Sequence, residues 1–125
     1  MHFIIGGAYQ GKQEYARLRF GLKQQDIFFC EEDRNADFSK ACISHMENFA
    51  YYCIRLGIEP AEELEHRAEE WQQNILICDD IFCGVVPADA DARAWREAAG
   101  RMACYLSRRA ESVTRVFCGL PIKLK

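Results

Sequence analysis

The sequence predicts an α/β fold of three layers, in which a mainly parallel sheet of about four to five strands is flanked by helices. Short apolar runs alternate along the chain with longer segments whose apolar residues recur every three or four positions. Strands that are separated by helices in this way pair in parallel through right-handed crossovers. The first apolar run ends at two glycines, as a buried strand does when it enters a tight turn. We expect a single domain over residues 1–125.

The first half of the chain predicts two strands and two helices. Residues 3–5 form the first apolar run, and from Lys12 onward the sequence changes to helix-favouring residues with an apolar stripe. Residues 26–31 give a second brief strand. From about residue 38 to residue 56 the apolar positions follow helical spacing, which predicts one amphipathic helix that Gly57 ends.

The second half predicts two more helices and the remaining strands. A proline at the first turn favours an acidic surface helix over residues 61–71. Residues 74–78 form an apolar run that suits a strand buried on both faces. A helical pattern covers residues 88–110, residues 112–119 predict a fourth strand, and residues 121–125 add a short fifth.

Composition and charge restrict the class of partner and the compartment. The net charge of -3 gives no global field that would attract a polyanion, so we expect no nucleic acid partner. The N-terminal apolar run is too short for a signal peptide or a membrane span, which favours a cytoplasmic protein without a membrane partner. The seven cysteines are scattered and form no C-x-x-C pair. Buried structural thiols are the favoured interpretation, with metal or disulfide chemistry as the alternative.

The stretch GGAYQGKQ, between the first strand and the first helix, carries the pattern of a phosphate-binding loop. Gly6, Gly11 and Lys12 fit the pattern G-x-x-x-x-G-K-[ST]. A glycine-rich turn lets backbone N–H groups approach a phosphate, and the lysine adds a mobile positive charge. The expected fold is therefore P-loop NTPase-like, although a plain glycine turn is the alternative. The candidate phosphate-binding residues are Gly6, Gly7, Ala8, Tyr9, Gln10, Gly11, Lys12 and Gln13.

Gln13 departs from the pattern, because a serine or threonine hydroxyl normally ligates Mg²⁺ at this position. Mg²⁺ demands near-ideal octahedral geometry, so a longer amide reaches the ion only with a shifted arrangement. We expect phosphate binding to tolerate this change better than phosphoryl transfer does.

Asp79 and Asp80 directly follow the apolar strand at residues 74–78. Carboxylates at the C-terminal end of a parallel strand face the crevice where α/β sheets bind ligands. The two aspartates are therefore candidates for the metal-orienting or catalytic acid, and they could hold Mg²⁺ through water. A simple turn acid is an equally good interpretation.

Three further motifs accompany the loop, namely GVVP at 84–87, RAWREAAGR at 93–101 and GLPIKLK at 119–125. With GGAYQGKQ, they resemble in content and order the motifs of the bifunctional adenosylcobinamide kinase/adenosylcobinamide-phosphate guanylyltransferase family. The resemblance covers roughly residues 1–20 and 74–125. It implies a P-loop fold that uses ATP or GTP to phosphorylate a corrinoid, cobinamide, and then transfers GMP through a histidine intermediate. It also implies a homo-oligomer, commonly a trimer.

The chain departs from this family in its middle. Asp80 matches the glutamate of the family's Val-Ser-Asn-Glu-Val-Gly motif, and Asp79 matches its asparagine. The family is longer after its second strand, where its members carry the guanylylated histidine. His45 lies in the helix predicted after the second strand and is a candidate nucleophile, but it lacks the surrounding family pattern. Alternatively, residues 41–43 overlay the family's Val-Asp-Cys-Leu strand and the histidine segment is absent, which is the interpretation we favour.

Three functional hypotheses follow. The first is a reduced cobinamide kinase-like phosphotransferase that uses ATP or GTP. The second is a nucleotide-sensing or partner-regulating module that has lost the chemistry and kept the fold. In the third, the glycine loop is only a turn and the protein works through an oligomer surface. Guanylyl transfer is not expected, because a covalent route needs a positioned nucleophile.

Overall fold

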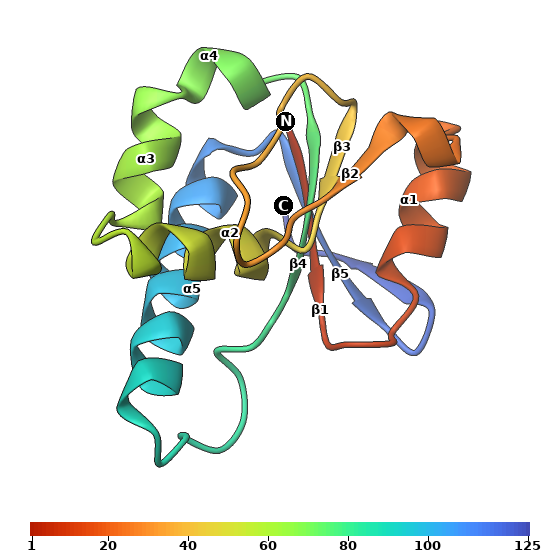
Figure 1. Ribbon diagram of the computed structural model, residues 1–125. Helices are drawn as coiled ribbons and strands as arrows, with labels where there is room; N and C mark the ends of the chain where they lie inside the picture. Colours follow the sequence, from red (N-terminus) through yellow and green to blue (C-terminus); the bar gives the residue numbers. More distant parts are fainter.

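A computed structural model describes residues 1–125 and contains one six-stranded sheet in the order β2-β3-β4-β1-β5-β6 (Figure 1). All neighbouring strands pair in parallel except β5 and β6, which pair antiparallel. The strands are β1 (His2–Gly6), β2 (Ile27–Phe29), β3 (Cys42–Ser44), β4 (Ile75–Asp79), β5 (Ser112–Phe117) and β6 (Leu120–Lys123). The expected mainly parallel α/β sheet is confirmed, with one antiparallel strand at its edge.

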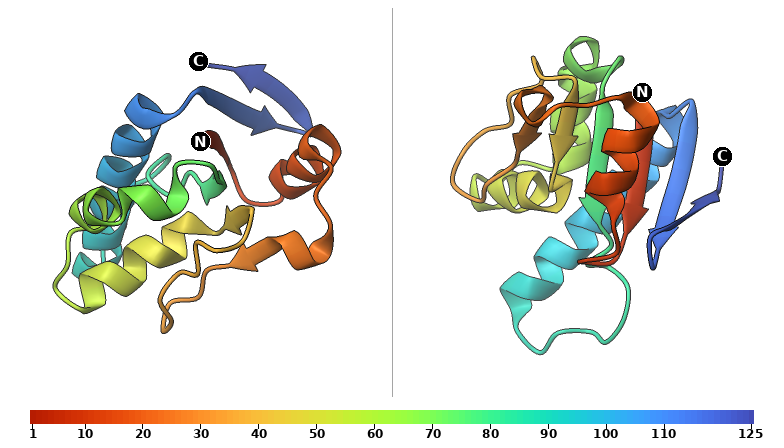
Figure 2. Two further views of the ribbon diagram at one scale, coloured as in Figure 1. Left: turned by 90° about the horizontal axis from the view of Figure 1, so that it is seen from above. Right: turned by 90° about the vertical axis from the view of Figure 1, so that its right-hand side faces the viewer.

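Helices cover both faces of the sheet, which makes the three layers that the sequence predicts. Helix α1 lies on one face and the other four helices lie on the opposite face (Figures 1 and 2). The helices are α1 (Lys12–Phe20), α2 (Met46–Arg55), α3 (Pro60–His66), α4 (Ala68–Trp71) and α5 (Ala90–Arg109), and a 3-10 turn, η1 (Gln24–Asp26), precedes β2. None of these helices combines the length and the apolar character needed to cross a membrane.

The core is divided into two parts by the central strands. Phe3 and Leu76 point into a cluster of 20 buried residues beneath α2 and α5, while Ile4 and Ile77 point into a cluster of seven beneath α1. This alternation follows from the period of two along a strand, and burial on both faces explains why these runs are apolar throughout. Four of the seven cysteines are buried, and all seven are free thiols. The structural interpretation therefore holds for the buried four.

The helix predicted over residues 38–56 is wrong in its first part. Residues 42–44 form β3, which lies between β2 and β4 with all three side chains buried, and only residues 46–55 are helical. Three residues are too few to display the period of a strand, so in the sequence alone the helical spacing of α2 continues backward through them. The sheet has six strands for this reason, rather than four or five.

Two other boundaries differ from expectation. The helix predicted over residues 61–71 is split into α3 and α4 at Arg67, where the backbone leaves helical geometry. The guanidinium of Arg67 donates to the carbonyl of Ala36 and to Glu70, which ties this break to the loop before β3. The last predicted strand begins one residue early, as β6 at Leu120, after a tight turn with positive φ at both of its residues.

Candidate functional site

The glycine loop joins the central strand β1 to α1, and close contacts explain two of its glycines. A Cβ atom on Gly6 would lie 2.4 Å from the carbonyl oxygen of Val116 in β5, a distance that no side chain tolerates. Gly11 has a φ of 92°, and an added Cβ there would come within 3.3 Å of Gly119. The loop therefore needs glycine at these positions because it passes directly against β5 and the turn that follows it.

The backbone of the loop offers a row of hydrogen-bond donors. No backbone N–H group from Gly7 to Glu14 donates to another group of the chain, and the first that does is that of Tyr15, to the carbonyl of Gly11 at 2.9 Å. The turn between β5 and β6 holds the loop from outside, because the N–H of Gly119 donates to the Gln10 carbonyl at 2.8 Å. The free N–H groups and the start of α1 make this the electropositive end of the helix.

Lys12 is the charged residue at the centre of the site. Its ammonium donates to the carbonyl of Gly7 at 2.6 Å and forms an ion pair with Asp79 Oδ1 at 2.7 Å, and its side chain is 7% exposed. Asp79 ends β4 directly opposite Gly6 of β1, so the parallel register of these two strands brings the carboxylate to the loop. The structure thus brings together the lysine and the first of the two aspartates that the sequence singled out.

Asp80 lies on the other side of the loop. Its N–H group donates to the Gly6 carbonyl at 3.1 Å, and its carboxylate lies 3.9 Å from the guanidinium of Arg115 in β5. The two aspartates therefore have different partners, Lys12 for Asp79 and Arg115 for Asp80. Both sit at the carboxyl end of the sheet, next to the loop.

Gln13 reaches across the site to the end of β3. Its side-chain nitrogen donates to the hydroxyl of Ser44 at 3.3 Å and lies 3.4 Å from Nε2 of His45. The residues do not build the usual P-loop magnesium site, because position 13 offers no hydroxyl and Asp79 Oδ1 is held by Lys12. Ser44 supplies a hydroxyl in the same region, but from a different strand.

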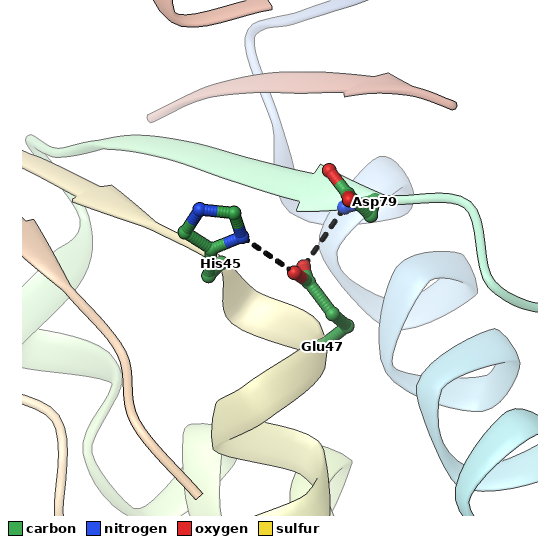
Figure 3. A group of neighbouring side chains, drawn as sticks. All are labelled: His45, Glu47 and Asp79. Carbon is green, nitrogen blue, oxygen red and sulfur yellow. Dashed lines mark hydrogen bonds and ion pairs between the residues drawn. The ribbon is translucent and has the colours of Figure 1, made fainter. Parts of the chain in front are cut away.

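His45 and Glu47 complete the polar side chains beside Asp79 (Figure 3). Nδ1 of His45 lies 2.7 Å from Oε1 of Glu47, and Oε2 of Glu47 accepts a hydrogen bond from the backbone N–H of Asp79 at 2.8 Å. The hydrogen bond with Glu47 raises the pKa of His45, against the opposing effect of burial. The imidazole is thus oriented by a carboxylate that is itself fixed to β4.

The position of His45 contradicts the interpretation that places it in a helix, whereas β3 at residues 42–44 agrees within one residue with the favoured alternative of a strand at residues 41–43. His45 does not lie in a helix after the second strand, but directly follows β3 and precedes α2, with a left-handed φ of 60°. The connection between β2 and β3 holds neither a helix nor a histidine over residues 30–41. The sequence did not single out Glu47, although a carboxylate on the apolar face of an amphipathic helix was a signal that could have revealed it.

A cavity of about 490 Å³ lies beside the glycine loop. Its wall consists of residues 8–14 of the loop and the start of α1, Ser44 at the end of β3, His45 after it, and Ile77 and Asp79 of β4. The cavity therefore lies at the carboxyl ends of neighbouring parallel strands, where open α/β sheets bind their ligands. Its size fits a small-molecule ligand.

Arg96 of the RAWREAAGR segment holds the loop that follows Asp80. The guanidinium of Arg96 donates to the carbonyls of Phe82, Gly84 and Val85, at 2.7 to 3.2 Å. In the same helix, Trp95 donates its indole N–H to the Glu47 carbonyl at 2.7 Å. This segment therefore positions both the GVVP loop and the first turn of α2.

The part of the chain from β3 to β6 matches a known protein family. The model of the family described as cobinamide kinase / cobinamide phosphate guanyltransferase matches residues 42–124. This match spans β3 to β6 and excludes the glycine loop. The family match and the geometry of the glycine loop are therefore independent observations on the two parts of the site. No curated protein matches the chain. Because the matched region is more than half of the chain, the chain belongs to the cobinamide kinase / cobinamide phosphate guanyltransferase family.

Proposed function

We propose that this chain binds the phosphates of ATP or GTP in the loop between β1 and α1. Family membership supports a role in cobalamin biosynthesis, with a nucleotide and cobinamide as ligands. One observation carries the proposal: a buried lysine lies within a loop whose backbone N–H groups from Gly7 to Glu14 have no partner in the chain. Such a loop at the start of a helix is suited to an anion.

Phosphate binding requires Lys12 to change partners. Its ammonium is now neutralised by Asp79, at 2.7 Å. A phosphate in the loop would offer several anionic oxygens to the same ammonium, while the free N–H groups donate to the others. The lysine would then turn from Asp79 toward the phosphate, and the carboxylate would become available for another cation.

Calorimetric titration with ATP, GTP and their diphosphates, each with and without Mg²⁺, tests the proposal. We expect heat of binding in the native chain, and its loss in Lys12→Ala. Lys40→Ala is a suitable control, because Lys40 is exposed and outside the cavity. No heat with any nucleotide, or equal binding by Lys12→Ala, would contradict the proposal. The comparison with and without Mg²⁺ tests whether the ion accompanies the nucleotide.

We propose that the chain lacks guanylyl transfer. The connection between β2 and β3 contains no histidine, and both ring nitrogens of His45 already face polar neighbours, Glu47 and Gln13. Incubation with GTP labelled at the α-phosphate is expected to give no covalent label on the protein. A label that disappears in His45→Asn would identify this histidine as the nucleophile and overturn this part of the proposal.

The kinase and the sensing module differ in whether a phosphorylated product forms. Incubation of the protein with cobinamide and a triphosphate labelled at the γ-position separates them. Labelled cobinamide phosphate would establish the phosphotransferase, in which Asp79 or Asp80 is the candidate acid. Binding without product would favour the nucleotide-sensing or partner-regulating module. The absence of a hydroxyl at Gln13 favours the module.

An oligomer is a separate proposal, supported by the exposed edge of the sheet. Strand β6 lies at this edge (Figure 2), and Leu120, Ile122 and Leu124 are 67%, 47% and 60% exposed. An edge strand with apolar side chains is a template for pairing with another chain. Light scattering after gel filtration tests for the trimer that the family resemblance implies. The single domain over residues 1–125 and the cytoplasmic location stay predictions.

A further inference from the structure

We infer that His45, Glu47 and Asp79 form a binding site for a divalent transition metal such as Zn²⁺ (Figure 3). One ligand atom from each of the three residues lies within 4.8 Å of the others. The three residues come from two elements, the β3–α2 junction and the end of β4, which the sheet holds in fixed register. This site does not depend on the proposed nucleotide binding.

The negative charges of Glu47 and Asp79 favour a bound cation. The side chain of Glu47 is 6% exposed and that of Asp79 is 18% exposed, so both carboxylates are largely removed from water. Lys12 is the only lysine or arginine that pairs with either of them. One lysine therefore faces two carboxylates in a partly buried site, and burying the second negative charge without a further cation is costly. A divalent ion bound between the carboxylates and the imidazole would balance it.

The donor atoms favour a transition metal over Mg²⁺. Imidazole suits zinc, copper, iron and nickel, whereas magnesium prefers an all-oxygen shell. Metal bonds to nitrogen and oxygen are about 2.0–2.2 Å long. Nδ1 of His45 and Oε1 of Glu47 are 2.7 Å apart, so one ion can contact both atoms with little movement. A carboxylate oxygen of Asp79, which lines the cavity, lies within 4.8 Å of the ligand atoms of the other two residues and completes the set.

The backbone conformation of His45 also favours a function for its imidazole ring. His45 has φ of 60° and ψ of 49°, a left-handed conformation that non-glycine residues adopt at a cost. This conformation ends β3, begins α2 and directs the ring toward Glu47, two residues further along the chain. A residue that served only to start the helix would not need an imidazole there, because the ring makes no capping hydrogen bond.

Cobalt titration of the chain, freed of metal with EDTA and without nucleotide, tests the site. We expect one equivalent of Co²⁺ to bind with visible absorption bands of a nitrogen and oxygen environment. His45→Asn is the best variant, because asparagine also tolerates the left-handed backbone. It should weaken Co²⁺ binding by at least about tenfold, as should Glu47→Gln. Circular dichroism shows whether each variant keeps the native fold.

Two controls make the test specific. His66→Asn removes an imidazole at the end of α3, outside the cavity, and should leave the affinity unchanged. Lys12→Met removes the cation that competes for Asp79 Oδ1, so it should tighten Co²⁺ binding while it abolishes phosphate binding. This opposite response separates failure of the metal site from failure of the nucleotide site.

Three results would overturn the inference. The first is the absence of saturable Co²⁺ binding. The second is equal affinity of His45→Asn and the native chain, in a variant that keeps its circular dichroism. The third is an intense thiolate-to-cobalt absorption band, which would place the ion on an exposed cysteine, namely Cys83, Cys104 or Cys118.

Discussion

Replacement of Gly6 by alanine tests how tightly the glycine loop is packed against the sheet. The added Cβ would lie 2.4 Å from the Val116 carbonyl oxygen, about 1 Å closer than an ordinary contact of 3.4 Å. The obstacle is backbone in the neighbouring strand β5, so β1 and β5 must separate near the loop. Overpacking of this kind costs about 1–3 kcal/mol of unfolding free energy. For a chain of this size, about 2 kcal/mol lowers the Tm by roughly 8 °C.

Gly7→Ala is the matched control for this experiment. A Cβ atom on Gly7 would meet Gln10 at 3.4 Å and Asp80 at 3.7 Å, which are ordinary contacts. We therefore expect Gly7→Ala to unfold within about 0.5 kcal/mol of the native chain. Urea denaturation of the three proteins, monitored by circular dichroism, gives both values. If the two variants are equally stable, the close approach of the loop to β5 is wrong, and so is the reasoning that glycine is required there.

Three further predictions concern the loop, the GVVP segment and the thiols. Gln13→Ser should make nucleotide affinity more dependent on Mg²⁺ in calorimetry, and a flat metal dependence would show that position 13 is misinterpreted. Arg96→Ala removes the donors to three carbonyls of the loop after Asp80, so limited proteolysis should cut this loop faster than in the control Arg108→Ala. A thiol reagent at pH 8 should label three cysteines in the native chain and seven after unfolding. The four protected residues are Cys30, Cys42, Cys53 and Cys78, because burial raises the pKa of the first three to about 12 and that of Cys78 well above its usual value, so that they stay protonated.

Local signals made the first part of the site predictable from the sequence. The run at residues 3–5, the glycines after it and the helix from Lys12 are adjacent in the chain, so their spacing alone defines strand, turn and helix. The placement of Asp79 beside this loop was also foreseeable, because the ends of parallel strands meet at one edge of a sheet.

The rest of the site depends on contacts between distant residues, which no local pattern encodes. Strand β3 is only three residues long and is defined by its pairing with β2 and β4. Glu47 was recognisable as a carboxylate on the apolar face of a helix, but one of its partners, the N–H group of Asp79, lies 32 positions later in the chain. The helical spacing placed His45 in a helix, and only the resemblance to the family's Val-Asp-Cys-Leu strand favoured a strand at residues 41–43. Extension of the predicted helix through this short strand therefore misplaced the histidine.

Asp79 links the two proposed sites, and this leads to a last prediction about their coupling. Its Oδ1 atom is held by Lys12, and its N–H group holds Glu47. When Lys12 turns to a phosphate, the two carboxylates lose their only lysine, and their attraction for a divalent cation increases. Nucleotide and metal should therefore strengthen each other's binding by the same factor, about fivefold or more.

Calorimetric titration with Co²⁺ at saturating ADP, and with ADP at saturating Co²⁺, measures this factor in both directions. ADP binds Co²⁺ itself, so the reference is His45→Asn, in which that contribution remains and the coupling within the protein disappears. Lys12→Met should also lose the coupling, because its Co²⁺ affinity is already increased without a phosphate. If the native chain and His45→Asn give the same factor, Lys12 does not transmit the effect of the phosphate to the carboxylates, and the two sites are independent.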